Sequence, residues 1–198
     1  MKTNRRQFLT ASTLIPASVM VGSVVAAESE PAGDADIGFC QDMSVHHLQA
    51  LAMCQRVLGR DTGDSVQAAA AEVLQNQAIE VGQMRAWLTD WGASTVPPER
   101  VMAWMGANRG TGMPIGMMPG YASEEQLAEL STLEGRSRGR RWLELMRAHH
   151  EGGVMMADQA QNLASSAKVV RLAKFQVNAQ SYEISIYDML LAQTYALD

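Results

Sequence analysis

Residues 43–53 read MSVHHLQALAM, and residues 146–156 read MRAHHEGGVMM. Each stretch has a methionine at both ends and a His-His pair between them, and the two stretches lie 103 residues apart. The pairs, His46-His47 and His149-His150, contain all 4 histidines of the chain. One offset shared by several residue types is the signature of an internal duplication. The repeated side chains can bind metals, so the first hypothesis is a metal-binding protein.

A second match at the same offset follows each pair. It joins an amide, a carboxylate and a β-branched residue in one pattern: Gln77, Glu80 and Val81 correspond to Gln180, Glu183 and Ile184. The duplication therefore extends well beyond the histidines, and each copy is long enough to hold two helices.

Hydrophobic periodicity predicts four long helices, at about residues 36–59, 64–91, 140–163 and 166–196. Ser123 and Gln126 form a capping box that opens a shorter helix, which ends at Gly135. No segment alternates with period two for long enough to form a strand. The predicted fold class is all-α, a four-helix bundle of two duplicated helical hairpins joined by a long crossover.

The predicted bundle domain, residues 34–198, consists of a first repeat (36–92), a connector (93–138) and a second repeat (139–196). The connector is rich in Met, Gly and Pro up to residue 122. Because such a segment is a poor packed element, we expect it to lie outside the bundle and to tune metal uptake without being required for folding. The alternative is that its methionines cover the open end of the bundle.

The N-terminus has the pattern of a twin-arginine signal peptide. Arg5-Arg6 precede an uncharged stretch that ends in Ala26-Ala27, which are small enough for cleavage. We expect residues 1–27 to be removed and the mature protein to be periplasmic or otherwise extracytoplasmic. The alternative, an uncleaved membrane anchor, is disfavoured by Pro16 and the serines around it.

The charge of the mature chain is acidic. The whole chain has a formal net charge of −5, and residues 1–27 contain three basic residues and no acid, so their removal leaves −8. This charge argues against nucleic acid and anionic membranes as partners, and we expect no stable membrane insertion after cleavage. About 170 residues suit one domain with one core. The sequence leaves the oligomeric state open, a homo-oligomer included.

Cys40 and Cys54 are the 2 cysteines. On a single helix, residues so spaced are about 21 Å apart, because the rise is about 1.5 Å per residue. That separation is too large for a disulfide. The two cysteines are therefore small core residues or soft metal ligands.

Both members of each His-His pair fall within the apolar sector of their predicted helix, with Ala50 or Gly153 between them one turn later. Glu80 and Glu183 lie on the apolar stripes of the other two long helices. A buried carboxylate needs a partner, and imidazole or a metal would serve. The alternative to a metal site is a buried His–Glu hydrogen-bond network that fixes the helix register.

The motif Met-x-x-His-His-x-x-(Ala/Gly)-x-x-Met, followed by Gln-x-x-Glu-(Val/Ile), resembles the family called domain of unknown function 305. The resemblance runs from Asp36 to Ile184 and includes Met118-Pro119-Gly120 ahead of the short acidic helix. It implies a ferritin-like helical fold. It also implies copper binding, because the family includes periplasmic copper-binding proteins of the CopM type.

The two copies depart from each other and from the family pattern. Gly139 is the counterpart of Asp36, and Tyr187 is the counterpart of Met84. The cysteines are not part of the family motif. The two halves therefore need not bind metal equally.

Imidazole and thioether together favour copper, Cu(I) above all, and leave zinc and iron open. Carboxylates beside such ligands would orient them or act as hard ligands. The candidate ligands are His46, His47, His149, His150, Met43, Met53, Met146 and Met156, with Glu80 and Glu183 as the carboxylates.

Two other classes of function compete with copper binding. One is a metal-free helical interaction module of the cell envelope. The other is a di-metal oxidase, which requires Glu-x-x-His motifs. The residues three positions before the histidines are Met43, Ser44, Met146 and Arg147, so the motif is missing. We therefore expect a binding protein and not an enzyme.

Overall fold

The protein is described by a computed structural model that covers residues 31–196. Its long elements are α1 (Asp34–Gln55), α2 (Asp64–Asp90), α3 (Glu124–Thr132), α4 (Gly135–Leu163) and α5 (Ala167–Gln193). The connector adds two short strands, β1 (Arg100–Val101) and β2 (Met113–Pro114), and two 3-10 turns, η1 (Gly106–Asn108) and η2 (Ile115–Met117). The predicted signal peptide, residues 1–27, lies outside the described residues.

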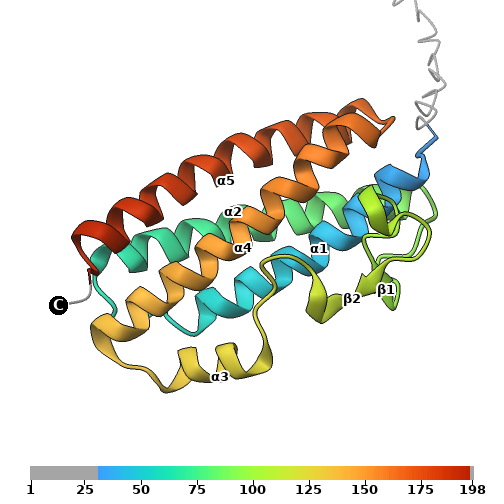
Figure 1. Ribbon diagram of the computed structural model, residues 1–198. Coiled ribbons are helices and arrows are strands. Elements are labelled where there is room, and N and C mark those ends of the chain that lie inside the picture. Colours follow the sequence, from blue (N-terminus) through green and yellow to red (C-terminus); the bar gives the residue numbers. More distant parts are fainter. Residues whose placement is uncertain (1–30, 197–198) are drawn as a thin grey trace, which may run out of the picture.

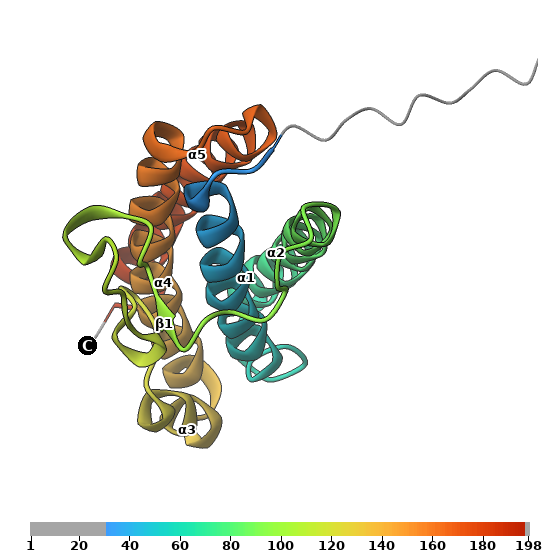
Figure 2. The same cartoon turned by 90° about the vertical axis from the view of Figure 1, so that its right-hand side faces the viewer.

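The four long helices form two hairpins, as predicted (Figure 1). α1 packs on α2 and α4 packs on α5, and the hairpins meet through α1 and α4. Viewed from the side, α1 and α4 lie next to each other, with α2 and α5 outside them (Figure 2). The all-α fold class is therefore confirmed. The differences are local: α4 begins at Gly135 and not near residue 140, and β1 and β2 pair as a two-residue antiparallel ladder.

The two ends of the bundle are closed by different contacts, although the residues concerned, Asp36 and Gly139, are counterparts in the two repeats. The Asp36 carboxylate accepts hydrogen bonds from the backbone amides of Gly33, Ser165 and Ser166, so it ties the start of α1 to the α4–α5 turn. At the counterpart position a side chain would collide, because a Cβ on Gly139 would lie 2.6 Å from the carbonyl oxygen of Thr62. The divergence between Asp36 and Gly139 thus reflects different packing at each end.

The apolar side chains divide into two clusters, one on each side of the histidines. We call the first the sulfur-rich cluster, because its buried members include Cys40, Met43, Met84, Met102, Met105, Met118 and Met156. We call the second the aromatic cluster, because Trp142, Tyr187 and Tyr195 lie in it with Cys54, Met53 and Met146. Each fully buried side chain of this size stabilises the fold by about 1.5–3 kcal/mol.

The expectation that the connector lies outside the packed bundle is wrong. Met102, Met105 and Met118 are buried in the sulfur-rich cluster, while Met117 is exposed. The connector is held by α1: Asp42 accepts hydrogen bonds from the backbone amide of Met102 at 2.6 Å and from Trp104 Nε1 at 2.8 Å. A loop rich in Pro and Gly can pack in this way because side chains of the helix satisfy its backbone groups.

The two cysteines lie in different clusters, which agrees with the expectation that they form no disulfide with each other. Burial raises the pKa of each thiol to about 12, so both are protonated at neutral pH. A protonated thiol is a poor ligand, and the cysteines act as core residues in this conformation. Among the described residues, no helix has the length and apolar character needed to cross a membrane.

Candidate metal centre

The four histidines form one buried layer in the middle of the bundle. The rings of His46 on α1 and His149 on α4 stack with their centroids 3.6 Å apart and an interplanar angle of 25°. His47 and His150 flank this stack, with ring centroids 6.5 Å and 6.3 Å from those of their neighbours. All four side chains are fully buried. Both members of each pair therefore face the interior, as the helical pattern predicted.

The outer two histidines are paired with the two carboxylates. His47 Nε2 lies 2.7 Å from Glu80 Oε2, and His150 Nε2 lies 2.6 Å from Glu183 Oε2. A carboxylate accepts here, so each Nε2 donates its proton. The prediction that these acids need a partner is confirmed, and the partner in each copy is the second histidine of the pair.

The inner two histidines are paired with backbone carbonyls. His149 Nε2 lies 2.9 Å from the carbonyl oxygen of His46, and His46 Nε2 lies 3.3 Å from that of Pro119 in the connector. Every Nε2 in the layer thus faces an oxygen acceptor, which assigns its proton by the hydrogen-bond network. The lone pair of each ring is then on Nδ1. All four Nδ1 atoms are buried and have no hydrogen-bond partner among the described residues.

Burial keeps the stacked pair uncharged. It lowers the pKa of His46 from 6.5 to about 3, and repulsion from any proton on the neighbouring His47 acts in the same direction. It also lowers the pKa of His149 well below its ordinary value, with the other three histidines acting in the same direction. The desolvation of imidazolium is the main cause in both cases. Two neutral imidazoles with free lone pairs are therefore present at any pH near neutrality.

The four candidate methionines lie on both sides of this layer, all fully buried. Met43 and Met156 belong to the sulfur-rich cluster, and Met53 and Met146 belong to the aromatic cluster. Each side thus has one methionine from each copy of the motif. The structure therefore brings the four histidines and the two glutamates together, and it places the four methionines in the two clusters on either side of them.

The two copies of the site are not equivalent. Gln176 Nε2 donates to Glu80 Oε2 at 2.6 Å, so Glu80 is held by two donors, one from each hairpin. The counterpart of Gln176 is Val73, and within residues 31–196 Glu183 has His150 as its single donor. The duplication pattern missed Gln176 because this residue occurs in one copy only. The feature of the sequence that could have identified Gln176 is its position on the apolar stripe of α5.

The space beside Gly153 is filled by a side chain. A Cβ on Gly153 would lie 2.2 Å from Gln180 Oε1, so the amide occupies the place of the missing methyl group. This Oε1 is buried and has no hydrogen-bond partner among the described residues. The room that this glycine leaves beside His149 and His150 is therefore taken by a facing side chain.

The connector covers the histidines on the α1/α4 face. We call residues 118–122 the strap. Gly120 lies so close to α4 that a Cβ would be 2.2 Å from the carbonyl oxygen of Ala148. Gln49 fixes the end of the strap through two hydrogen bonds to the backbone of Ala122, at 2.8 Å and 2.7 Å. Sequence reasoning missed Gln49 and Asp42, which lie on the same side of α1 as His46 at helical spacing.

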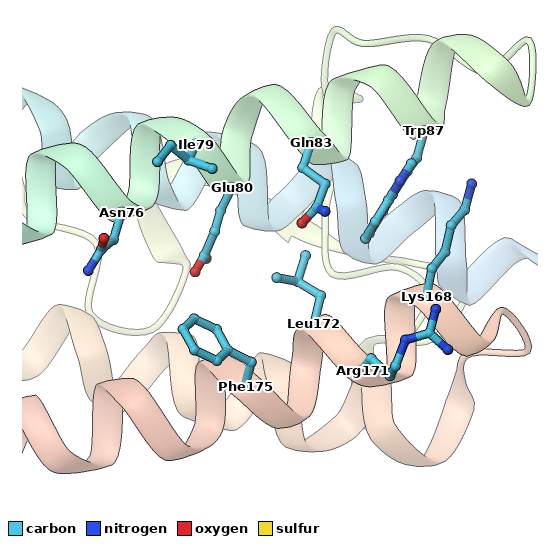
Figure 3. A pocket seen from close by; sticks show the side chains of 9 residues that line it. All are labelled: Asn76, Ile79, Glu80, Gln83, Trp87, Lys168, Arg171, Leu172 and Phe175. Atoms are coloured by element: carbon cyan, nitrogen blue, oxygen red, sulfur yellow. The ribbon is translucent and has the colours of Figure 1, made fainter.

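On the opposite face, α2 and α5 are separated by a groove. Two adjoining cavities of about 400 Å³ and 190 Å³ share Asn76 and Phe175, and together they form what we call the α2/α5 groove. Glu80 lines the first cavity and Glu183 the second. Figure 3 shows the Glu80 carboxylate pointing from α2 towards α5. The carboxylates that contact the histidines are therefore the part of the site nearest to solvent on this face.

The donor set fits a soft metal better than a hard one. Among the described residues, no three His, Cys, Asp or Glu side chains converge as a metal-binding group in this conformation. Sites for hard cations, which need several oxygen ligands, are therefore not preformed. Cu(I) prefers thioether and imidazole ligands, and four buried Nδ1 atoms have no hydrogen-bond partner within the described part of the chain.

The family model of DUF305, a domain of unknown function, matches residues 36–191. A DUF305 protein of Streptomyces coelicolor has 36% identical residues and a TM-score of 0.75, over 83% of this chain and 96% of its own. A DUF305 fragment from Deinococcus radiodurans has 31% identity and a TM-score of 0.69, over 82% and 99%.

CopM in the Cu(I)-bound form has the same fold at 21% identity, with a TM-score of 0.62 over 81% of this chain and 98% of its own. Among curated proteins, none matches the sequence. The predicted resemblance is confirmed over nearly all of the described chain. The duplicated His-His hairpins, the strap and the match over residues 36–191 show that this chain belongs to the DUF305 family.

Proposed function

We propose that this protein binds and buffers copper outside the cytoplasm, with Cu(I) as the favoured ion. The observation that carries the proposal is the state of the four imidazoles. Each Nε2 is committed to an oxygen acceptor, and each Nδ1 is buried without a partner among the described residues. Burying an unpaired lone pair costs free energy. Four such Nδ1 lone pairs in one layer therefore favour the binding of a ligand there.

The chemistry of the surrounding side chains supports the same ion. Histidine Nδ1 atoms would hold the metal, and Met43, Met53, Met146 and Met156 would supply soft sulfur ligands. Glu80 and Glu183 would fix the ring orientation and the tautomer of His47 and His150, as carboxylates commonly do behind metal-binding histidines. CopM, which shares the fold, has been solved in Cu(I)-, Cu(II)- and Ag-bound forms.

The role we propose is binding and not catalysis, with the metal ion as the partner. The chain contains no Glu-x-x-His motif, which carboxylate-bridged di-metal enzymes use. Zinc and iron are the competing ions and belong in the same binding test as copper.

The test compares thermal melting with and without each metal in the wild type and in two double variants, H46A/H47A and H149A/H150A. Under the proposal, Cu(I) raises the melting temperature of the wild type, and each double variant loses part or all of that shift. A M43L/M156L variant keeps the apolar volume and removes two thioethers, so it separates the role of sulfur from that of packing.

The alternative, a hydrogen-bond network that only fixes the helix register, gives a different result. H149A/H150A would leave Glu183 without its histidine and H46A/H47A would leave Glu80 with Gln176 alone, so each variant would lose about 1–3 kcal/mol of stability. The wild type would show no metal-dependent shift. A wild type that is indifferent to copper, zinc and iron would end the metal proposal.

We also propose export by the twin-arginine route, with the mature protein in the periplasm or an equivalent compartment. The support is the Arg5-Arg6 pattern and the relative from Streptomyces coelicolor, which is described as secreted. Replacing both arginines by lysine keeps the charge and should stop maturation, which is followed by the size of the protein in the exported fraction. Unchanged processing would show that another route is used.

A further inference from the structure

The α2/α5 groove has an exposed apolar border. Ile79 on α2 and Phe175 and Tyr182 on α5 are 63%, 57% and 67% exposed. They line the two cavities of the groove, and Figure 3 shows Ile79 and Phe175 from opposite sides of it. An exposed apolar patch along a groove is typical of an interaction site. Nothing in the binding of copper requires these three side chains to be apolar.

The groove also has charges of opposite sign at its two ends. Lys168 and Arg171 line the end near the start of α5, and Glu72 lines the end near the start of α2. Lys168 lies over the rings of Trp87 and Trp91, at 5.2 Å and 4.5 Å from their centroids.

None of the three charged groups, Lys168, Arg171 and Glu72, takes part in an ion pair within the described chain. The groove therefore has an exposed apolar border around the Glu80 and Glu183 carboxylates, a basic end and an acidic end, and the charges at its two ends are available to a partner.

We propose that a second copy of this chain docks on the α2/α5 groove to form a two-fold symmetric homodimer. When the two-fold axis lies in the interface, perpendicular to the long direction of the groove, the grooves of the two copies run in opposite directions. The basic end of one copy then meets the acidic end of the other, and this happens twice. Such self-complementarity is what an isologous interface requires. Phe175 and Tyr182 of each copy would lie in the groove of its partner and supply the apolar contact.

The first part of the test measures sedimentation equilibrium over a range of protein concentrations at moderate salt. We expect the wild type to form dimers. F175E places a charge in the centre of the interface and should weaken dimerisation by about tenfold or more, as the loss of a central aromatic residue does. V96E is the control, because Val96 is also exposed (70%) but does not line the groove and the change adds the same charge.

The second part exchanges the charges at the two ends. K168E/R171E makes both ends acidic and E72R makes both ends basic, so each of these two variants should dimerise about tenfold more weakly or worse through like-charge repulsion. An equal mixture of the two variants should form heterodimers. The combined variant K168E/R171E/E72R should form homodimers again, because both contacts then join opposite charges. Circular dichroism checks that each variant is folded.

Two results would overturn the proposal. One is a wild type that stays monomeric up to about 100 µM, a concentration above the dissociation constant of an ordinary specific dimer. The other is a dimer that is unaffected by F175E, by K168E/R171E and by E72R, which would place the interface on another face. Both measurements are made on metal-free protein, so they do not depend on copper binding.

Discussion

The stacked rings of His46 and His149 make the stability of the metal-free protein sensitive to acid. In the unfolded chain each ring takes up a proton below about pH 6.5, whereas burial lowers the pKa of folded His46 to about 3. Between these values the unfolded state binds more protons, so stability falls as the pH falls. Each buried histidine contributes a slope of about 1.4 kcal/mol per pH unit. Urea unfolding of metal-free protein from pH 7 to pH 4 measures this slope.

Asp42 acts in the opposite direction and serves as an internal control. Burial raises the pKa of its carboxyl from 3.8 to about 6, so its contribution to stability is lost as the pH rises through that range. D42N should therefore steepen the loss of stability between pH 6 and pH 4, and H46Q should make it shallower. A profile that is flat over this range in the wild type and unchanged by H46Q would contradict the buried neutral stack.

The hydrogen bond from Gln176 holds Glu80 in its His–Glu pair more tightly than Glu183 is held in the other pair. Single substitutions test this difference. Q176V removes the donor 2.6 Å from Glu80 and should cost about 1–3 kcal/mol. It should also speed proton exchange at His47 Nε2, as seen by NMR of nitrogen-labelled histidine, towards the rate at His150. V73Q places an amide at the counterpart position and should slow exchange at His150. Equal exchange rates at both histidines in the wild type would count against this asymmetry.

The strap depends on Gly120, which permits the close approach of its backbone to that of α4. G120A should destabilise the protein for two reasons: φ of residue 120 is +74°, and the new methyl group would lie 2.2 Å from the carbonyl oxygen of Ala148. G110A is the control, since φ is +80° and no atom lies within 4 Å of the added Cβ. The backbone effect alone costs about 1–2 kcal/mol. Thermal melting of the two variants should show a clearly larger loss for G120A, and equal losses would mean that the strap moves freely away from α4.

The elements differ in how far the sequence determines them. The long helices were predictable because each has an apolar stripe, and the residues of such a stripe are those that the helix buries. The packing of the connector was not predictable, since its anchors, Asp42 and Gln49, lie outside it on α1 and look like ordinary polar helix residues. The burial of Met118 and the exposure of Met117 show that composition alone does not tell which methionines of a loop are core residues.

At the scale of the molecule, the offset of 103 residues predicted the two hairpins, and the apolar stripes predicted that Glu80 and Glu183 need a buried partner. Whether the two His-His pairs meet, and which group pairs with each carboxylate, were left open by the sequence and are answered by the structure. The offset could not predict the difference between the copies. Gln176 and Val73 occupy equivalent positions, and only the three-dimensional structure shows that one of them reaches the other hairpin.

The strap and the groove together decide how an ion could leave the centre of this molecule. The strap covers the α1/α4 face, whereas Glu80 and Glu183 line the α2/α5 groove, so the groove is the way out. When a second copy occupies the groove, that exit is closed. Retention of copper would then rise with the concentration of the protein: a dilute sample should yield its metal to a chelator quickly, and a crowded one slowly. Under the two proposals together, the protein would hold its ion longest at high concentration and release it on dilution.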